Sequence, residues 1–444
     1  MAQKADTIFA LATPPGQSAI AVFRISGPAA QQVGVALSGK ELQHRLAMPA
    51  LLSDDEGHLL DEAVLVYFEG PHSATGEDTL EIQCHGSLAV CDAVAEYLRG
   101  KTGLRPAGPG EFTQRAFANG KLDLTSVEGL ADLIDAQTET QRQQALSQLK
   151  GGLRRQVEAW RHDIIALVAR LESVIDFADE ELPDTVLTEI IDKRQALIDR
   201  IAQELDDGRR GEIIRHGLVA TLLGPVNAGK STALNALAKR PAAIVSNEAG
   251  TTRDIVEVRL SMAGIALSIL DTAGIRETDG AIEQIGIARA QEAAGESDLV
   301  ILIMDGSQPN WVEEAQRLVK DITGPVIRVM NKADCAVEDA PEGYLSLSLH
   351  QEADIQQLED AIIAVLKPLN RDGASSLITR QRHRDLLTKT VSALEESRQA
   401  SLEFEPELVA ESLRQASHAL AQLTGHIDVE DILGDIFSSF CIGK

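Results

Sequence analysis

Short apolar runs separated by Pro and Gly turns open the chain, from TIFALAT at residues 7–13 to TLEIQCHG at residues 79–86. Runs of this length, bounded by turn residues, are typical of β-strands. The segment SLAVCDAVAEYL that follows has apolar positions at helical spacing. We therefore expect a small α+β domain over residues 1–119.

The pattern changes after residue 119. Residues 125–215 and 377–433 are rich in Ala, Leu, Gln, Glu and Arg with apolar positions at helical spacing, which predicts helices. The segment between them alternates apolar strands with helical patterns. An inserted domain requires only chain ends that lie close together, so we expect a discontinuous helical domain (120–215 and 376–444) with residues 216–375 inserted as an α/β domain.

A phosphate-binding loop lies at the start of that inserted segment. Gly224-x-x-x-x-Gly229-Lys230-Ser231 follows an apolar strand and precedes a helical pattern, which is the context that a P-loop requires. Its backbone N–H groups face phosphates, the Lys neutralises their oxygens and the Ser hydroxyl binds Mg²⁺. The predicted nucleotide contacts here are Asn227, Ala228, Gly229, Lys230, Ser231 and Thr232.

Two further strand ends match a GTP site in the expected order. Asp271, Thr272, Ala273 and Gly274 follow the strand IALSIL, where an Asp holds Mg²⁺ through water and a Gly reaches the γ-phosphate. Asn331, Lys332 and Asp334 follow PVIRVM. A carboxylate at the last position accepts from guanine N1–H and N2–H₂, which selects GTP over ATP. The guanine-supporting loop, Ser348-Leu349-His350, departs from the Ser-Ala-Lys of many GTPases.

The hydrolytic residues are less ordinary. Ile275 occupies the place where Ras-like enzymes carry a water-positioning Gln. Glu277, Asp279 and Glu283 are candidates for that role and Arg276 is a candidate charge stabiliser, although all four are equally compatible with solvated loop charges. Upstream, Thr251 or Thr252 is expected to complete the Mg²⁺ shell. The polar switch segment predicted to contact nucleotide is Ser246, Asn247, Glu248, Ala249, Gly250, Thr251 and Thr252.

Charge and composition restrict the remaining function classes. The net charge of −27 disfavours extensive binding to nucleic acid or to anionic membranes, and aromatic residues, 3% of the chain, are too few for a base-stacking surface. No targeting segment or long apolar run occurs, which predicts a cytoplasmic protein. The four scattered cysteines indicate no disulfide framework.

Several longer motifs resemble one family over essentially the whole chain. They are PVNAGKS, AGTTRD, DTAGIRET, GPGEFTQRAFANGKLDLTSVEGLADLI and the C-terminal CIGK. Together they are similar to the MnmE (TrmE) family of bacterial and organellar tRNA-modification GTPases. The resemblance implies a multidomain α/β + α fold: an N-terminal tetrahydrofolate-binding and dimerisation domain, a discontinuous helical domain and an inserted Ras-like P-loop G domain.

The resemblance also implies a reaction and its cofactors. With an FAD-dependent partner, MnmG, a homodimer of the chain would add an aminomethyl-type group to carbon 5 of the tRNA wobble uridine, with a 5-formyl or methylene tetrahydrofolate as one-carbon carrier. Asn227, Ser246, Glu248 and Thr251 would bind K⁺, which pairs the G domains; Ser231 and Thr252 would bind Mg²⁺; Glu283 would orient water. The implied folate residues are Arg24, Glu81, Lys121 and Lys444, with Cys441 nearby as a candidate reactive thiol.

Two other functions fit part of the sequence. A regulatory GTP switch, for example in ribosome assembly, would recruit a partner without modification chemistry and would have no use for a folate site. A folate-binding scaffold with a degraded G domain would turn over negligible GTP, which conflicts with the intact Lys230, Asp271 and Asp334.

Overall fold

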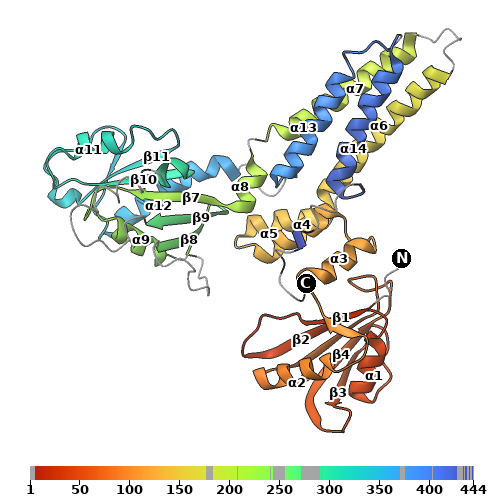
Figure 1. Cartoon of the computed structure of the whole chain (residues 1–444). Helices are drawn as coiled ribbons and strands as arrows, with labels where there is room; N and C mark the ends of the chain where they lie inside the picture. Colours follow the sequence, from red (N-terminus) through yellow and green to blue (C-terminus); the bar gives the residue numbers. More distant parts are fainter. Residues whose placement is uncertain are drawn as a thin grey trace. The chain divides into compact units, whose positions relative to one another are not determined.

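The computed structural model describes most of the chain, which divides into two compact units. The described residues are 6–176, 184–207, 209–240, 242–243, 256–271, 291, 293–370, 376–402, 404–427, 434, 436–437, 440 and 443. The first unit comprises Met1–Ala131, Gln148–Ser173 and Ala410–Lys444, and the second Asp132–Ser147 and Val174–Val409. Two sheets and a set of long helices are present (Figure 1), so the predicted multidomain α/β + α class is confirmed. The boundaries proposed at residues 119, 215 and 375 stay predictions, since both units share the helical segments.

The first unit contains a mainly antiparallel sheet in the order β3-β4-β5-β2-β1-β6, in which only β1 and β6 pair in parallel. Its core includes Leu37 and Leu98 from helices α1 (Ala30–Ser38) and α2 (Leu88–Arg99). Strands β2 and β5 are in a register that sets Arg24 opposite Glu81. The strands are β1 (Thr7–Leu11), β2 (Ser18–Ser26), β3 (Ala47–Ser53), β4 (Leu59–Phe68), β5 (Thr79–Gly86) and β6 (Leu104–Pro106).

Helices occupy the two segments where the helical pattern predicted them. They are α4 (Leu124–Asp135), α5 (Glu139–Leu149), α6 (Gly152–Asp176), α7 (Asp184–Leu205), α13 (Gln381–Glu396) and α14 (Pro406–Thr424). Helix α3 (Glu111–Ala118) precedes them, within residues 1–119. In the first unit, Arg414 of α14 forms an ion pair with Glu172 of α6 at 3.0 Å. In the second, buried Arg194 of α7 donates to the Ser397 carbonyl oxygen at 2.6 Å. Among the described helices, none is long and apolar enough to cross a membrane.

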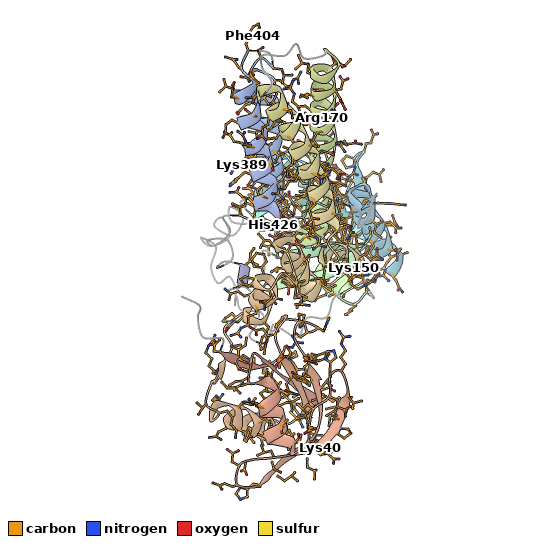
Figure 2. All side chains as sticks on the ribbon, turned by 90° about the vertical axis from the view of Figure 1, so that its right-hand side faces the viewer. Lys40, Lys150, Arg170, Lys389, Phe404 and His426 are labelled. Carbon is orange, nitrogen blue, oxygen red and sulfur yellow. The ribbon has the colours of Figure 1, made fainter. Side chains whose placement is uncertain are left out.

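The turn between α13 and α14 carries an exposed aromatic residue. The side chain of Phe404 is 83% exposed, and Figure 2 shows it pointing away from the helices. No contact in the described structure explains this position.

The second unit contains a sheet in the order β12-β11-β10-β7-β9-β8, parallel except for the β8 and β9 pair. Strand β10 is buried along its whole length, and its side chains alternate between two apolar cores, Ile301 in one and Leu302 in the other. This all-apolar pattern is typical of a parallel strand covered on both faces. The strands are β7 (Leu218–Leu223), β8 (Val256–Met262), β9 (Ile265–Asp271), β10 (Leu299–Asp305), β11 (Val326–Asn331) and β12 (Tyr344–Ser346).

Helices follow these strands and cover the sheet. They are α9 (Lys230–Ala238), α11 (Trp311–Leu318) and α12 (Glu352–Leu366), with short 3₁₀ helices at η2 (Ala333–Cys335) and η3 (Lys367–Asn370). Leu234 of α9 and Ile362 of α12 belong to one core, and Trp311 of α11 belongs to the other. Because β7, β9, β10 and β11 are parallel, their carboxyl ends meet at one edge of the sheet. Ligands bind at this edge in open α/β folds.

The chain enters and leaves this sheet domain through two segments that are joined to each other. Helix α8 (Arg210–His216) leads directly into β7. Arg215 of α8 and Arg380, which precedes α13, both donate to the same carboxylate oxygen of Asp132 at 2.7 Å. Gly211 packs so close to the leaving segment that a Cβ atom would lie 2.0 Å from the Ile378 carbonyl oxygen. Only glycine fits there, and the two chain ends are held together as an inserted domain requires.

Candidate functional site

The loop after β7 adopts a backbone that only its glycines permit. Gly224 has φ +150, and a Cβ atom there would lie 2.0 Å from the Ile303 carbonyl oxygen. Gly229 has φ +106, and its Cβ would lie 2.2 Å from Nδ2 of Asn331. Asn227 between them is exposed with φ +62. The loop ends at the first residue of α9, so the N–H groups at the helix start form a phosphate-binding site.

Lys230 holds a positive charge within this loop. The residue is buried, and its Nζ donates to the carbonyl oxygens of Gly224 at 2.7 Å and Pro225 at 2.8 Å. A buried ammonium is costly unless it is hydrogen-bonded, and these carbonyl groups supply the bonds. The charge is therefore fixed within the loop that would bind phosphate oxygens.

Ser231 and Asp271, two residues predicted to hold Mg²⁺, come together at the strand edge. Ser231 Oγ donates to Asp271 Oδ2 at 2.9 Å, and Asp271 is only 2% exposed at the end of β9. A hydroxyl and a carboxylate are oxygen donors of the type that Mg²⁺ prefers, so this pair fits a Mg²⁺ ion bound with the nucleotide phosphates. Thr232 follows in the first turn of α9.

Asn331 connects the two loops that would surround the nucleotide. Its Nδ2 donates to the Ala228 carbonyl oxygen at 2.8 Å, and its Oδ1 accepts from the Leu349 N–H at 3.1 Å. Leu349 is buried and His350 is exposed. The contact from residue 349 is made by the backbone, so replacing the more usual Ala by Leu leaves this link in place.

Asp334 is exposed beside that loop, in a position to accept from a base. Hydrogen bonds from Ser348 and Cys335 hold the pKa of Asp334 below its ordinary value, so the carboxylate is ionised at neutral pH. Ser348 is itself fixed by its backbone N–H, which donates to Asp354 Oδ2 at 2.7 Å.

Asp305 is a site residue that the sequence reasoning missed. It ends β10, and its Oδ2 forms an ion pair with Lys332 Nζ at 2.6 Å. Burial alone would raise the pKa of Asp305, but hydrogen bonds from Lys332 and Ser307 outweigh it and keep the pKa below its ordinary value. Lys332 adopts φ +60, and the ion pair holds its side chain in the guanine loop. The signal was available, because an Asp ends the apolar strand LVILIMD as Asp271 ends its own.

The other predicted nucleotide and ion residues lie outside the described residues. They are Ser246, Asn247, Glu248, Ala249, Gly250, Thr251, Thr252, Thr272, Ala273, Gly274, Arg276 and Glu283. The same holds for Cys441 and Lys444 near the chain end. Their assigned roles stay predictions.

The first unit contains a second candidate site. A pocket of about 360 Å³ lies among residues from β4, β5 and the loops beside them. It brings together two residues implied for folate, Glu81 and Lys121; Arg24 holds Glu81 through an ion pair of 2.8 Å. Arg45 and His72 also line the pocket and were not identified from the sequence. The complete lining is Arg45, Phe68, His72, Ser73, Ala74, Thr79, Glu81 and Lys121.

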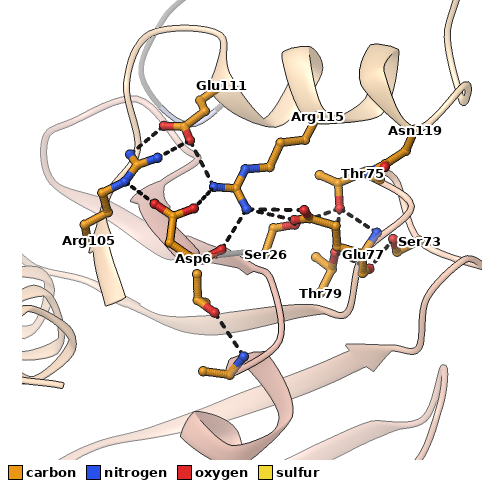
Figure 3. Close-up of polar contacts among 12 residues, drawn as sticks. Asp6, Ser26, Ser73, Thr75, Glu77, Thr79, Arg105, Glu111, Arg115 and Asn119 are labelled. Atoms are coloured by element: carbon orange, nitrogen blue, oxygen red, sulfur yellow. Dashed lines mark hydrogen bonds and ion pairs between the residues drawn. The ribbon is translucent and has the colours of Figure 1, made fainter. Parts of the chain in front are cut away.

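A charged network supports one wall of this pocket (Figure 3). Arg115 of α3 donates to Glu77 at 3.0 Å, to Glu111 at 3.0 Å and to Asp6 at 2.7 Å. Glu77 also accepts from Ser26 Oγ at 2.8 Å. Glu77 lies in the loop that carries the pocket residues Ser73 and Ala74, so Arg115 ties that loop to α3. This gives Glu111 and Arg115 of the motif GEFTQRAF a structural role.

Replacing Arg115 by Met should loosen this loop. Glu77 would lose its cation, whereas Asp6 and Glu111 keep their ion pairs with Arg105; leaving one partly buried partner without its donor costs about 1–3 kcal/mol. We expect faster hydrogen exchange of the amides in residues 70–79 and a lower free energy of unfolding for this domain. Arg99→Met is the control, since Arg99 is exposed at the end of α2. Equal exchange in both variants would contradict the assignment.

The P-loop, the buried strand-end Asp271 and the guanine loop at Asp334, all at one edge of a parallel sheet, define a P-loop GTPase. Two family models cover the chain: "GTP-binding protein TrmE N-terminus" matches residues 7–121, and "MnmE helical domain" matches residues 124–441. The chain belongs to the MnmE (TrmE) family of tRNA modification GTPases.

Relatives match along their full length. The tRNA modification GTPase MnmE of Parvibaculum lavamentivorans is 46% identical over 99% of this chain and 100% of its own length. The MnmE of Rhodopseudomonas palustris is 45% identical over 100% of both chains. Among solved structures, the G domain of the T. maritima FeoB iron transporter is 23% identical with a TM-score of 0.25, covering 33% of this chain and 97% of that domain. That weak likeness adds nothing to the fold described above.

Proposed function

We propose that this GTPase acts in modification of carbon 5 of the tRNA wobble uridine, together with an FAD-dependent partner of the MnmG type. The observation that carries the proposal is the full-length match to proteins named tRNA modification GTPase, in a chain that combines a GTP site with a separate N-terminal pocket. A tetrahydrofolate derivative would occupy the pocket as one-carbon carrier, and the chain would work as a homodimer. A plain regulatory switch has no need of such a pocket.

In the GTP site, residues of the P-loop, the switch segment and the guanine loop would bind and orient the nucleotide. Lys230 would neutralise β- and γ-phosphate oxygens, and Asp334 would accept from guanine. Ser231 and Thr252 would hold Mg²⁺, with Asp271 beside them; Mg²⁺ supplies charge neutralisation on the phosphates. Glu283 would orient the attacking water in place of the missing Gln, and Arg276 would stabilise charge.

A potassium ion is part of the proposed site. Asn227 fits the role of ligand because its exposed side chain stands at the tip of the P-loop with a left-handed backbone. Ser246, Glu248 and Thr251 would complete the set. A monovalent cation next to the phosphates offsets negative charge that develops in the transition state, and pairing of two G domains would enclose it.

The potassium dependence leads to a direct prediction. Replacing K⁺ by Na⁺ at constant ionic strength should lower the GTP hydrolysis rate at least about ten-fold, and Glu283→Ala should lower it about a hundred-fold in K⁺. Steady-state phosphate release measures both. Glu296→Gln is the control, because it removes an exposed carboxylate that lies further along the chain than Glu283. Equal rates in the two salts, or a Glu283→Ala enzyme at the wild-type rate, would contradict the respective assignments.

The folate part of the proposal uses the chemistry of the pocket. Glu81 would accept from the N–H groups of the pterin ring of the folate. Lys121 and Lys444 would bind the anionic glutamyl tail of the same molecule. Arg24 would act by orienting Glu81. Cys441 is a further candidate in the same C-terminal motif, as a thiol near the bound carrier.

The function is tested in cells that lack the endogenous protein. Nucleosides from their tRNA are analysed after complementation with this chain, with the chain truncated before Lys444, and with an empty vector. We expect the intact chain alone to restore the modified wobble uridine. Identical nucleoside profiles with the intact chain and the empty vector would overturn the proposal and favour the switch.

A further inference from the structure

Two cations in the N-terminal pocket pair with no carboxylate of the described residues. Arg45 and Lys121 both line it, and among the described residues neither forms an ion pair. The acidic residue among those lining the pocket, Glu81, is already paired with Arg24 at 2.8 Å. A pocket with two unpaired cations is suited to an anionic ligand.

Arg45 is held at this pocket by its backbone and its side chain. It adopts φ +60, its N–H donates to the Tyr67 carbonyl oxygen at 2.8 Å, and its Nη2 donates to the His72 carbonyl oxygen at 3.4 Å. His72 lies in the loop that Arg115 ties down through Glu77. The remaining N–H groups of the Arg45 guanidinium are available to a ligand, and a guanidinium binds a carboxylate through two parallel hydrogen bonds.

Glu81 gives the same pocket a second recognition group. Both contacts from Arg24, from Nε at 3.2 Å and from Nη2 at 2.8 Å, fall on Oε1 of Glu81. The second carboxylate oxygen accepts no side-chain hydrogen bond from the residues that the structure describes. That oxygen can therefore accept from an N–H group of a ligand. The pocket therefore suits one molecule that has both N–H donors and carboxylates.

We propose that Arg45, together with Lys121, binds the carboxylates of the glutamyl tail of the pocket ligand and so selects for tail-bearing forms. The inference rests on the proposed folate-dependent function and adds a specificity residue to it. Arg45 binds the anionic tail, whereas Glu81 accepts from the N–H groups. Changing only the tail of the ligand therefore separates the contribution of Arg45 to the affinity from that of Glu81.

The test compares two ligands that differ only in tail charge. The dissociation constants of 5-formyltetrahydrofolate and of its dimethyl ester are measured by calorimetry on the full-length protein. Wild type should bind the free acid at least about ten-fold more tightly than the ester, since a hydrogen bond to a charged group contributes on that order. Arg45→Gln should lose about ten-fold for the free acid and leave the ester unchanged. Arg45→Lys should retain part of the preference, and Arg99→Gln, which removes one charge outside the pocket, should behave as wild type.

The outcomes separate the inference from the function on which it rests. If wild type binds neither ligand, the folate step of the proposed function fails and the inference fails with it. If wild type binds both but Arg45→Gln weakens acid and ester equally, or weakens neither, the folate step stands and the role of Arg45 is overturned. Unchanged hydrogen exchange in residues 70–79 of Arg45→Gln would show that a selective loss does not come from a distorted loop.

Discussion

Replacing Asp334 by Asn should change the base that this GTPase accepts. The Asp334 carboxylate is exposed, ionised and held by Ser348, so it provides two acceptors for guanine N1–H and N2–H₂. Asn keeps one acceptor and sets an N–H₂ donor against the guanine amino group. We expect the affinity for GTP to fall at least about a hundred-fold, because two hydrogen bonds to a charged group are lost or reversed.

The same substitution should improve binding of xanthosine triphosphate. Xanthine carries an oxygen where guanine carries its amino group. The amide N–H₂ of Asn can donate to that oxygen, and the amide oxygen can accept from N1–H. Competition assays with a fluorescent nucleotide measure both affinities. Asp339→Asn, an exposed carboxylate beyond the same loop, is the control and should keep the preference for GTP. An Asp334→Asn variant with unchanged GTP affinity would mean that another residue reads the base.

The GTP site could be predicted from the sequence because each part of it is local. Gly224 to Ser231 form one continuous turn, and Asp271 and Asn331 each end an apolar strand. In a parallel sheet the carboxyl ends of strands meet at one edge. Motif order alone therefore brings Ser231 within 2.9 Å of Asp271, although they lie on different elements.

Other parts depend on contacts that no local pattern encodes. Arg45 reaches the pocket because an isolated left-handed residue turns the chain before β3, and its partner His72 belongs to a loop much further along. Asp132 accepts hydrogen bonds from Arg215 and Arg380, which lie at the two ends of the inserted segment. Such side chains look like ordinary solvated charges in the sequence. Their roles follow from sheet register and from contacts between segments that are far apart in the sequence.

Replacing Lys230 by Ala should nearly abolish GTP hydrolysis while the fold is kept. The ammonium is the cation that the described P-loop itself supplies to the phosphates, held by the carbonyl oxygens of Gly224 and Pro225. Removing one such preorganised group costs about 10²- to 10³-fold in rate. Single-turnover hydrolysis at saturating GTP, with Mg²⁺ and K⁺ present, separates this loss from weaker binding.

The fold should survive because the two carbonyl groups remain able to bind water once the side chain is gone, and Ala is a good residue for the start of α9. Lys239→Ala tests a lysine at the other end of the same helix, exposed and remote from the loop, and it should hydrolyse GTP at the wild-type rate. Circular dichroism should be alike for all three proteins. A Lys230→Ala enzyme that binds GTP and turns it over normally would contradict the assignment, because the transition state would then not depend on the charge that this loop is built to hold.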